Sequence, residues 1–85
     1  MKFYIVIPTR DVPRAMDLDS VKNPAPRELG EEFRDWERMR LRNGSLRFGF
    51  QSSERCAYFA DQIKAGDSRI EVAFDPPVAE WLDAS

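Results

Sequence analysis

Arginine is the side chain in this sequence with the clearest capacity to bind another molecule. Arg outnumbers Lys by 10 to 3, and its planar guanidinium group binds phosphate or carboxylate in a bidentate manner. Four arginines recur at spacings of seven, four and four residues and would lie along one line of a helix: Arg27, Arg34, Arg38 and Arg42. Glu31 falls within this row and Asp35 beside it, where their carboxylates would repel a phosphate backbone. The row therefore favours an ion-paired solvent-exposed face or a protein interface over nucleic acid.

The residues on which most catalytic and metal sites depend are missing. The sequence has no His and a single Cys, Cys56, so neither Ser-His-Asp nor Cys-His catalysis can be built within the chain. The same absence excludes a zinc site of the usual ligand set. Asp17 and Asp19 resemble part of an oxygen-ligand cation loop, but the pattern stops at two carboxylates. We therefore predict no catalytic residues, no metal and no other cofactor.

Length and composition indicate one small domain spanning residues 1–85. The chain has 85 residues, of which 42% are hydrophobic and 33% charged, which is too apolar for a disordered tail. The longest apolar run, Phe3–Ile7, is far shorter than a membrane span or the core of a signal peptide. Cys56 has no second Cys with which to form an internal disulfide. These features predict a cytoplasmic location.

The first strand and the segment after it differ in how clearly they can be predicted. Residues 2–8 alternate with apolar side chains on both faces, which predicts a central strand. Residues 9–25 form a long loop: residues 9–13 are typical of a turn, while a short helical turn and an irregular strand fit residues 14–21 equally well. We expect Met16 and Leu18 to close this loop against the core.

Residues 26–43 give the strongest prediction of a helix. Pro26 suits the first helical position, and Gly44 is typical of a helix end. Acidic residues precede basic ones along this segment, an order that favours the helix dipole. Its expected apolar stripe consists of Leu29, Phe33 and Trp36.

The second half of the chain has clearer patterns. Residues 45–51 alternate as a strand with three inward apolar side chains. A helix should begin after Ser52 or Ser53 and end at Gly66, because its apolar residues follow helical spacing. Residues 69–75 again alternate as a strand. The expected inward residues of the three elements are Leu46, Phe48 and Phe50; Cys56, Phe59, Ala60 and Ile63; and Ile70, Val72 and Phe74.

These elements predict an α+β fold with the α/β-like order β-α-β-α-β. We expect a two-layer sandwich: a small three-stranded mixed sheet, two amphipathic helices on one face, and a short C-terminal helix that begins near Asp75. Cys56 on the apolar stripe of the second helix should be an inert hydrophobe. The strands at 45–51 and 69–75 should run parallel if they share the sheet, with the first strand between or beside them.

The face of the sheet away from the helices is a candidate partner-binding surface. Tyr4 and Val6 should lie on it, flanked by polar residues that include Arg47 and Arg69. The alternative is that the C-terminal segment, with Trp81, folds over this face. Charge is also distributed unevenly along the chain: residues 1–55 carry +2 and residues 56–85 carry −4. This asymmetry would orient a partner more than it would affect the fold.

We therefore predict a small non-catalytic binding or regulatory protein that acts through protein–protein contact, without a membrane. An inhibitor or adaptor, such as a phage- or plasmid-borne antagonist of host machinery, would fit, and its partner is another protein or a second copy in a dimer. One alternative is a nucleic-acid-associated regulator that uses the Arg-rich helix 26–43. Another is a small carboxylate-based enzyme, with Arg10, Asp11 and Arg14 as the first place to look.

Overall fold

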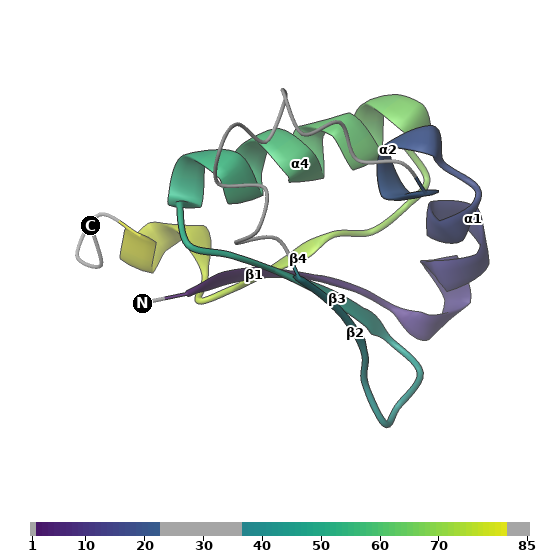
Figure 1. Ribbon diagram of the computed structural model, residues 1–85, viewed down its shortest axis with the longest axis horizontal. Coiled ribbons are helices and arrows are strands. Elements are labelled where there is room, and N and C mark those ends of the chain that lie inside the picture. The colour runs from purple at the N-terminus through teal and green to yellow at the C-terminus, as the bar shows by residue number, and fades with distance from the viewer. Residues whose placement is uncertain (1, 23–36, 82–85) are drawn as a thin grey trace.

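The computed structural model describes residues 2–22 and 37–81 (Figure 1). Within these residues, three short helices follow the first strand, a hairpin of two strands precedes the longest described helix, and a short strand and a 3-10 helix come last. In chain order, the elements are β1 (Phe3–Ile7), the 3-10 helix η1 (Thr9–Asp11), α1 (Val12–Met16), α2 (Asp19–Lys22), β2 (Glu37–Arg40), β3 (Leu46–Phe50), α4 (Ser53–Gly66), β4 (Ala73–Asp75) and the 3-10 helix η3 (Val78–Glu80).

The sheet has four strands in the order β2-β3-β1-β4, and every neighbouring pair is antiparallel. The prediction of a three-stranded mixed sheet was therefore wrong, because β2 adds a fourth strand. The prediction for β3 and β4 is confirmed in direction: both run opposite to β1, which lies between them, so they run parallel to one another. The α+β class is also confirmed.

The predicted helix at 26–43 is wrong over its second half. Residues 26–36 lie outside the described residues, but Glu37–Arg40 forms strand β2 and residues 41–45 turn the chain into β3. Charged and apolar residues alternate strictly from Arg38 to Arg42, which is a strand pattern. Gly44 adopts a φ of 90° in the hairpin turn, so Asn43-Gly44 is a hairpin signal here and not a helix stop.

Helix α4 follows its predicted boundaries. The Ser52 side chain caps it by accepting a bond from the Arg55 backbone N–H at 3.4 Å, and Gly66 is its last residue. The Phe59 ring packs against Phe48 and Phe50 of β3 at centroid distances of 5.1 and 5.5 Å. The predicted stripe of α4 is buried in full: Cys56, Phe59, Ala60 and Ile63.

The segment after β1 is helical. Residues 9–13, expected as a turn, form η1 and the start of α1. For residues 14–21 the helical option is correct, in α1 and α2, and residues 23–25 lie outside the described part. Val12, Ala15 and Val21 are buried, while Met16 and Leu18 pack on the core as predicted. This segment therefore belongs to the helical layer beside α4.

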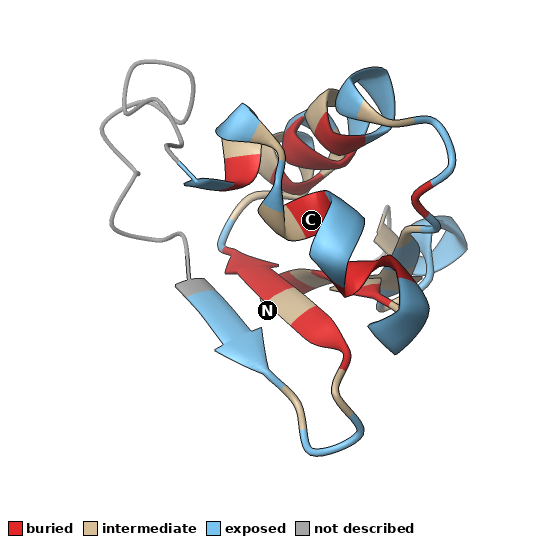
Figure 2. Ribbon diagram, turned by 90° about the vertical axis from the view of Figure 1, so that its right-hand side faces the viewer, coloured by how far each residue is buried: buried red, intermediate tan, exposed pale blue. Residues whose placement is uncertain are grey.

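The core lies between the sheet and the helical layer, on one side of the sheet (Figures 1 and 2). Ile70 is buried, and Val72 and Phe74 pack on the core from the β4 segment. The strand predicted at 69–75 is shorter than expected, since Ala73–Asp75 alone is paired with β1. Trp81 meets the rings of Phe3 and Phe74 edge-on at 5.4 and 5.2 Å.

Candidate partner-binding face

One face of the sheet carries side chains that point away from the core. Phe3, Ile5 and Ile7 of β1 are buried, so the alternating residues of β1 and their partners in register lie on the other side. Among the described residues, α1, α2 and α4 all lie on the core side (Figure 1), which leaves this outer side without a helical layer. The residues that it carries on β1 to β4 include Tyr4, Val6, Met39, Arg47, Gly49 and Ala73, together with Asp75, which lies opposite Tyr4 in the register.

Tyr4, Arg47 and Met39 form a connected group on this face. The Arg47 guanidinium carbon lies 4.2 Å from the centroid of the Tyr4 ring, which is cation–π geometry. The same guanidinium places Nη2 3.7 Å from the Met39 sulfur. Met39 is 48% exposed, and Tyr4 and Val6 are partly buried. We call these four residues, Tyr4, Val6, Met39 and Arg47, the Tyr4 patch.

Beside the Tyr4 patch, the β2–β3 hairpin gathers positive charge. We call residues 38–47 the arginine hairpin. It extends away from the helical layer (Figure 1), and β2 and the turn are largely exposed (Figure 2). It contains no Asp or Glu; Glu37 directly precedes it in β2, and the next acidic residue after it is Glu54. Its four cationic residues are Arg38, Arg40, Arg42 and Arg47.

Hydrogen bonds fix the turn of the arginine hairpin to the rest of the protein. The Thr9 hydroxyl donates to the Asn43 carbonyl at 2.7 Å. The Asn43 side-chain oxygen accepts from the Ser45 backbone N–H at 3.0 Å and from its hydroxyl at 2.6 Å. Arg40 Nε donates to the Gly44 carbonyl at 2.7 Å, which uses one of the five donors of that guanidinium group.

The predicted site residues divide into three groups. The arginine hairpin carries Arg38, Arg42 and Arg47. Since this segment is a hairpin, the predicted helical line through Arg38 and Arg42 is wrong. Arg27 and Arg34 lie outside the described residues. Tyr4 lies on the outer face as predicted, against Arg47.

Arg69 lies apart from these residues, in the turn before β4. Its Nη2 and Nε donate to the two carboxylate oxygens of Asp67 at 2.8 and 2.9 Å. Those bonds and the Arg69 backbone N–H lower the pKa of Asp67 to about 2. Arg69 is therefore held by a local ion pair and does not join the Tyr4 patch.

Arg40 and Met39 fell within the predicted helix at 26–43 and were not selected as site residues. The alternation of Arg and apolar residues from 38 to 42 was the signal that could have placed both on a strand. The predicted alternative, that Trp81 covers the outer face, is also wrong. Trp81 contacts Phe3 and Phe74, whose side chains lie on the core side.

Asp11 is the most constrained carboxylate near the end of β1. It is buried, and it accepts hydrogen bonds from the Glu71 backbone N–H at 3.0 Å and from Arg14 Nη1 at 2.7 Å. The bond from Glu71 is the main reason that the pKa of Asp11 is lowered. A general base in an apolar pocket would need its pKa raised, so Asp11 has the opposite character.

The other described side chains that could take part in catalysis or bind a metal ion do not form a site. Cys56 is buried, which raises the pKa of its thiol to about 12 and fits the predicted inert role. Residues 2–22 and 37–81 hold no group of three or more Cys, Asp or Glu side chains arranged to bind a metal ion. Within the same ranges, no helix combines the length and hydropathy needed to cross a bilayer.

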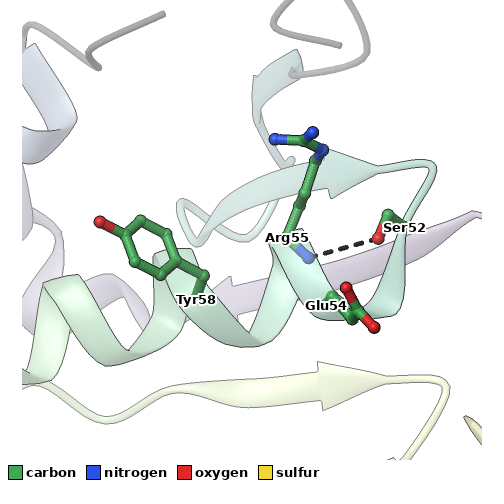
Figure 3. A pocket seen from close by; sticks show the side chains of 4 residues that line it. All are labelled: Ser52, Glu54, Arg55 and Tyr58. Atoms are coloured by element: carbon green, nitrogen blue, oxygen red, sulfur yellow. Dashed lines mark hydrogen bonds between the residues drawn. The ribbon is translucent and has the colours of Figure 1, made fainter. Parts of the chain in front are cut away.

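A hollow of about 440 Å³ lies at the start of α4 (Figure 3). Its lining residues are Ser52, Glu54, Arg55 and Tyr58. The side chains of Glu54, Arg55 and Tyr58 leave the helix in different directions, and the Ser52 hydroxyl is used as the helix cap. A ligand site needs polar groups that converge on one point, and this hollow lacks that arrangement.

No protein-family model, curated protein sequence or solved structure matches this chain. Its function must therefore be inferred from the surfaces that the fold presents. The Tyr4 patch and the arginine hairpin are continuous through Met39 and Arg47, which belong to both. Together they form the largest arrangement of interface-type side chains described above.

Proposed function

We propose that this protein is a small non-catalytic binding or regulatory protein that acts through protein–protein contact at the Tyr4 patch. An inhibitor or an adaptor subunit is the kind of protein that fits this description. The observation that carries the proposal is the stacking of Arg47 on Tyr4 beside Met39, on a sheet face that no described helix covers.

The chemistry of the patch supports a protein partner. Tyr, Met and Arg are enriched in protein interfaces, where aromatic and guanidinium groups supply much of the binding energy. The Tyr4 ring and the Arg47 guanidinium already hold each other in place, so less side-chain entropy is lost when a partner binds. The lowered pKa of Asp11 does not favour a general base, and the raised pKa of Cys56 does not favour a thiolate nucleophile.

Nucleic acid is the second candidate, and one feature favours it. A two-stranded β-ribbon can enter the major groove of DNA, and the arginine hairpin is such a ribbon with cationic side chains. The overall net charge of −2 weighs against it, because nucleic-acid affinity depends mainly on a positive field.

The test is affinity capture from the native host, followed by measurement with the purified partner. The wild-type protein is compared with Tyr4→Ala and with Tyr58→Ala, which removes a Tyr exposed on α4. We expect Tyr4→Ala to weaken the partner's affinity by about ten-fold or more, as at interface hot spots. Tyr58→Ala should bind as the wild type does.

Two results would contradict the proposal. One is that the wild-type protein retains no specific partner under conditions in which it remains folded. The other is that Tyr4→Ala and Tyr58→Ala weaken binding equally, because the contact would then not centre on the outer sheet face. Melting curves of both variants show whether a loss of binding follows a loss of folding.

A further inference from the structure

The arginine hairpin and the rest of the chain carry opposite charge. Residues 38–47 contain four Arg and no acidic residue, and Glu37, the first residue of β2, directly precedes them. Since the whole chain has a net charge of −2, the remaining residues together carry −6. Such a charge distribution directs one element of the protein towards an anionic region of a partner. It disfavours a partner that is anionic throughout, because the acidic remainder would be repelled.

The arginines are distributed around the ribbon and not along one side of it. Arg38 and Arg40 lie opposite buried residues of β3 in the strand register, so they are on the face that carries the helices. Arg47 is on the outer face, over Tyr4. Arg42 is exposed in the turn. Carboxylates can meet Arg40 on one face, Arg47 on the other and Arg42 at the turn together only if the partner surrounds the ribbon, as the walls of a cleft do.

An exposed apolar side chain lies among the arginines. Met39 is 48% exposed on the outer face of β2, between Arg38 and Arg40 in sequence. A thioether gains nothing from a phosphate backbone, whereas it packs readily on a protein surface. The combination of Arg and Met without Lys therefore favours a protein over a nucleic acid.

The hairpin is also held in one position before any partner binds. The bond from the Thr9 hydroxyl to the Asn43 carbonyl, at 2.7 Å, ties the turn to the end of β1. Arg40 Nε donates a hydrogen bond to the Gly44 carbonyl at 2.7 Å within the turn. Insertion of a fixed ribbon costs less entropy than the ordering of a loose loop.

We infer that the arginine hairpin inserts into a carboxylate-lined cleft of a protein partner, with Met39 against the apolar part of that cleft. This inference rests on the proposed function and specifies the chemistry of the partner. The contact would join the hairpin and the Tyr4 patch in one continuous interface, because Arg47 belongs to both.

The test uses the full chain, labelled with ¹⁵N and titrated with a poly-glutamate peptide at physiological ionic strength. A short DNA duplex is titrated in parallel. We expect the peptide to shift the amide signals of residues 38–47 more than those of α4 or β4. Arg42→Glu should weaken peptide binding by about five-fold, because it reverses a charge at the turn. Lys22→Glu makes the same charge change on α2, where Lys22 is exposed, and should weaken it less than about two-fold.

Several results would overturn the inference. They are an absence of shifts in residues 38–47, an equal effect of Lys22→Glu and Arg42→Glu, and tighter binding of the DNA duplex than of the peptide. The captured partner separates this inference from the proposed function. If that partner is lost on Tyr4→Ala but binds Arg42→Glu as tightly as the wild type, the hairpin inference is wrong and the proposed function stands. If it is lost on Arg42→Glu alone, the hairpin is supported and the Tyr4 patch is not.

Discussion

The carboxylate of Asp11 accepts a hydrogen bond from the backbone N–H of Glu71 at 3.0 Å, across sixty residues of sequence. This bond joins the start of the first helical segment to the chain that leads into β4. Arg10 reinforces the connection from the surface, where its Nη2 lies 2.8 Å from a Glu71 carboxylate oxygen. Asp11 is therefore a structural carboxylate that links two distant parts of the chain.

Asp11→Asn should remove part of the acid sensitivity of folding. The pKa of Asp11 is lowered from 3.8 in the folded protein, so its stabilising effect is present above that value and is lost as pH falls through the folded pKa. We expect the melting temperature of the wild type to fall more steeply below pH 3.8 than that of Asp11→Asn. Differential scanning calorimetry over this range measures the difference.

Asp61→Asn is the control for Asp11→Asn, because Asp61 is exposed on α4. Arg69 holds the pKa of Asp67 near 2. The stabilising effect of Asp67 is lost as pH falls in the wild type and in both variants alike, so it does not contribute to the difference between them. If the wild type and Asp11→Asn melt in parallel at all pH values, folding does not lower the pKa of Asp11.

Phe48→Ala should destabilise the protein severely. Phe48 is fully buried at the centre of β3 and packs against Phe59 at 5.1 Å. Truncation of such a side chain costs about 3–5 kcal/mol, a large part of the stability of so small a domain. Met39→Ala on the neighbouring strand is the comparison, with an expected cost below about 1 kcal/mol because Met39 faces outwards. Urea denaturation monitored by circular dichroism gives both values, and an unchanged midpoint for Phe48→Ala would rule out its core position.

Gly44→Ala should loosen the arginine hairpin. The φ of 90° at Gly44 is in the left-handed region, and an added Cβ would lie 3.0 Å from Thr9 Cγ2. The conformational strain alone costs about 1–2 kcal/mol, and the contact should also disturb the bond from Thr9 to the Asn43 carbonyl. We expect a lower melting temperature and faster amide hydrogen exchange at Leu41 and Gly44, whose N–H groups donate within the turn.

Two variants of Thr9 separate the hydrogen bond from the strain at Gly44. Thr9→Val is nearly isosteric but removes the donor to the Asn43 carbonyl, and should cost about 1 kcal/mol. Thr9→Ser keeps the hydroxyl and should behave much more like the wild type. If Thr9→Val leaves exchange in the turn unchanged, the hairpin is not anchored through Thr9.

The elements that could be predicted from the sequence are those whose pattern is specified locally. Helix α4 has a Ser cap, helical spacing of its apolar residues and a terminal Gly66, and all of these agree with the structure. Strands β1 and β3 alternate clearly, so their inward residues could be named. The segment 37–43 combines a strand alternation with Glu, Arg and Met, which favour helices. There, pairing with β3 overrides the local preference.

The candidate site could be predicted in part only. Tyr4 and Arg47 could each be placed on the outer face, but their stacking depends on the register of β1 with β3, where Val6 lies opposite Arg47. The alternation of each strand specifies which face is buried, but without a hairpin turn between β1 and β3 it does not specify which residues lie opposite each other. The grouping of Arg38, Arg40 and Arg42 with Arg47 depends in the same way on the hairpin, which a helical interpretation of residues 26–43 concealed.

Cys56 should be unreactive in the folded protein. Burial of Cys56 on the core-facing side of α4 raises the pKa of its thiol from 9.0 to about 12, and the thiolate is the form that attacks a thiol reagent. Apart from steric protection, the thiolate fraction at neutral pH is then about a thousand-fold lower than that of a thiol with a pKa of 9.0. We expect almost no reaction with a disulfide reagent in native buffer and reaction of one thiol per chain in denaturant.

Cys56→Ser is the negative control for thiol labelling, because it has no thiol. Cys56→Ala tests how Cys56 contributes to packing, separately from its reactivity. Because the site is apolar, Cys56→Ala should retain more stability than Cys56→Ser, which buries a hydroxyl without a compensating partner. Fast labelling of the native wild type, at a rate independent of added denaturant, would mean that the thiol reaches solvent without unfolding. It would contradict the close packing of α4 on the sheet that positions every other element described above.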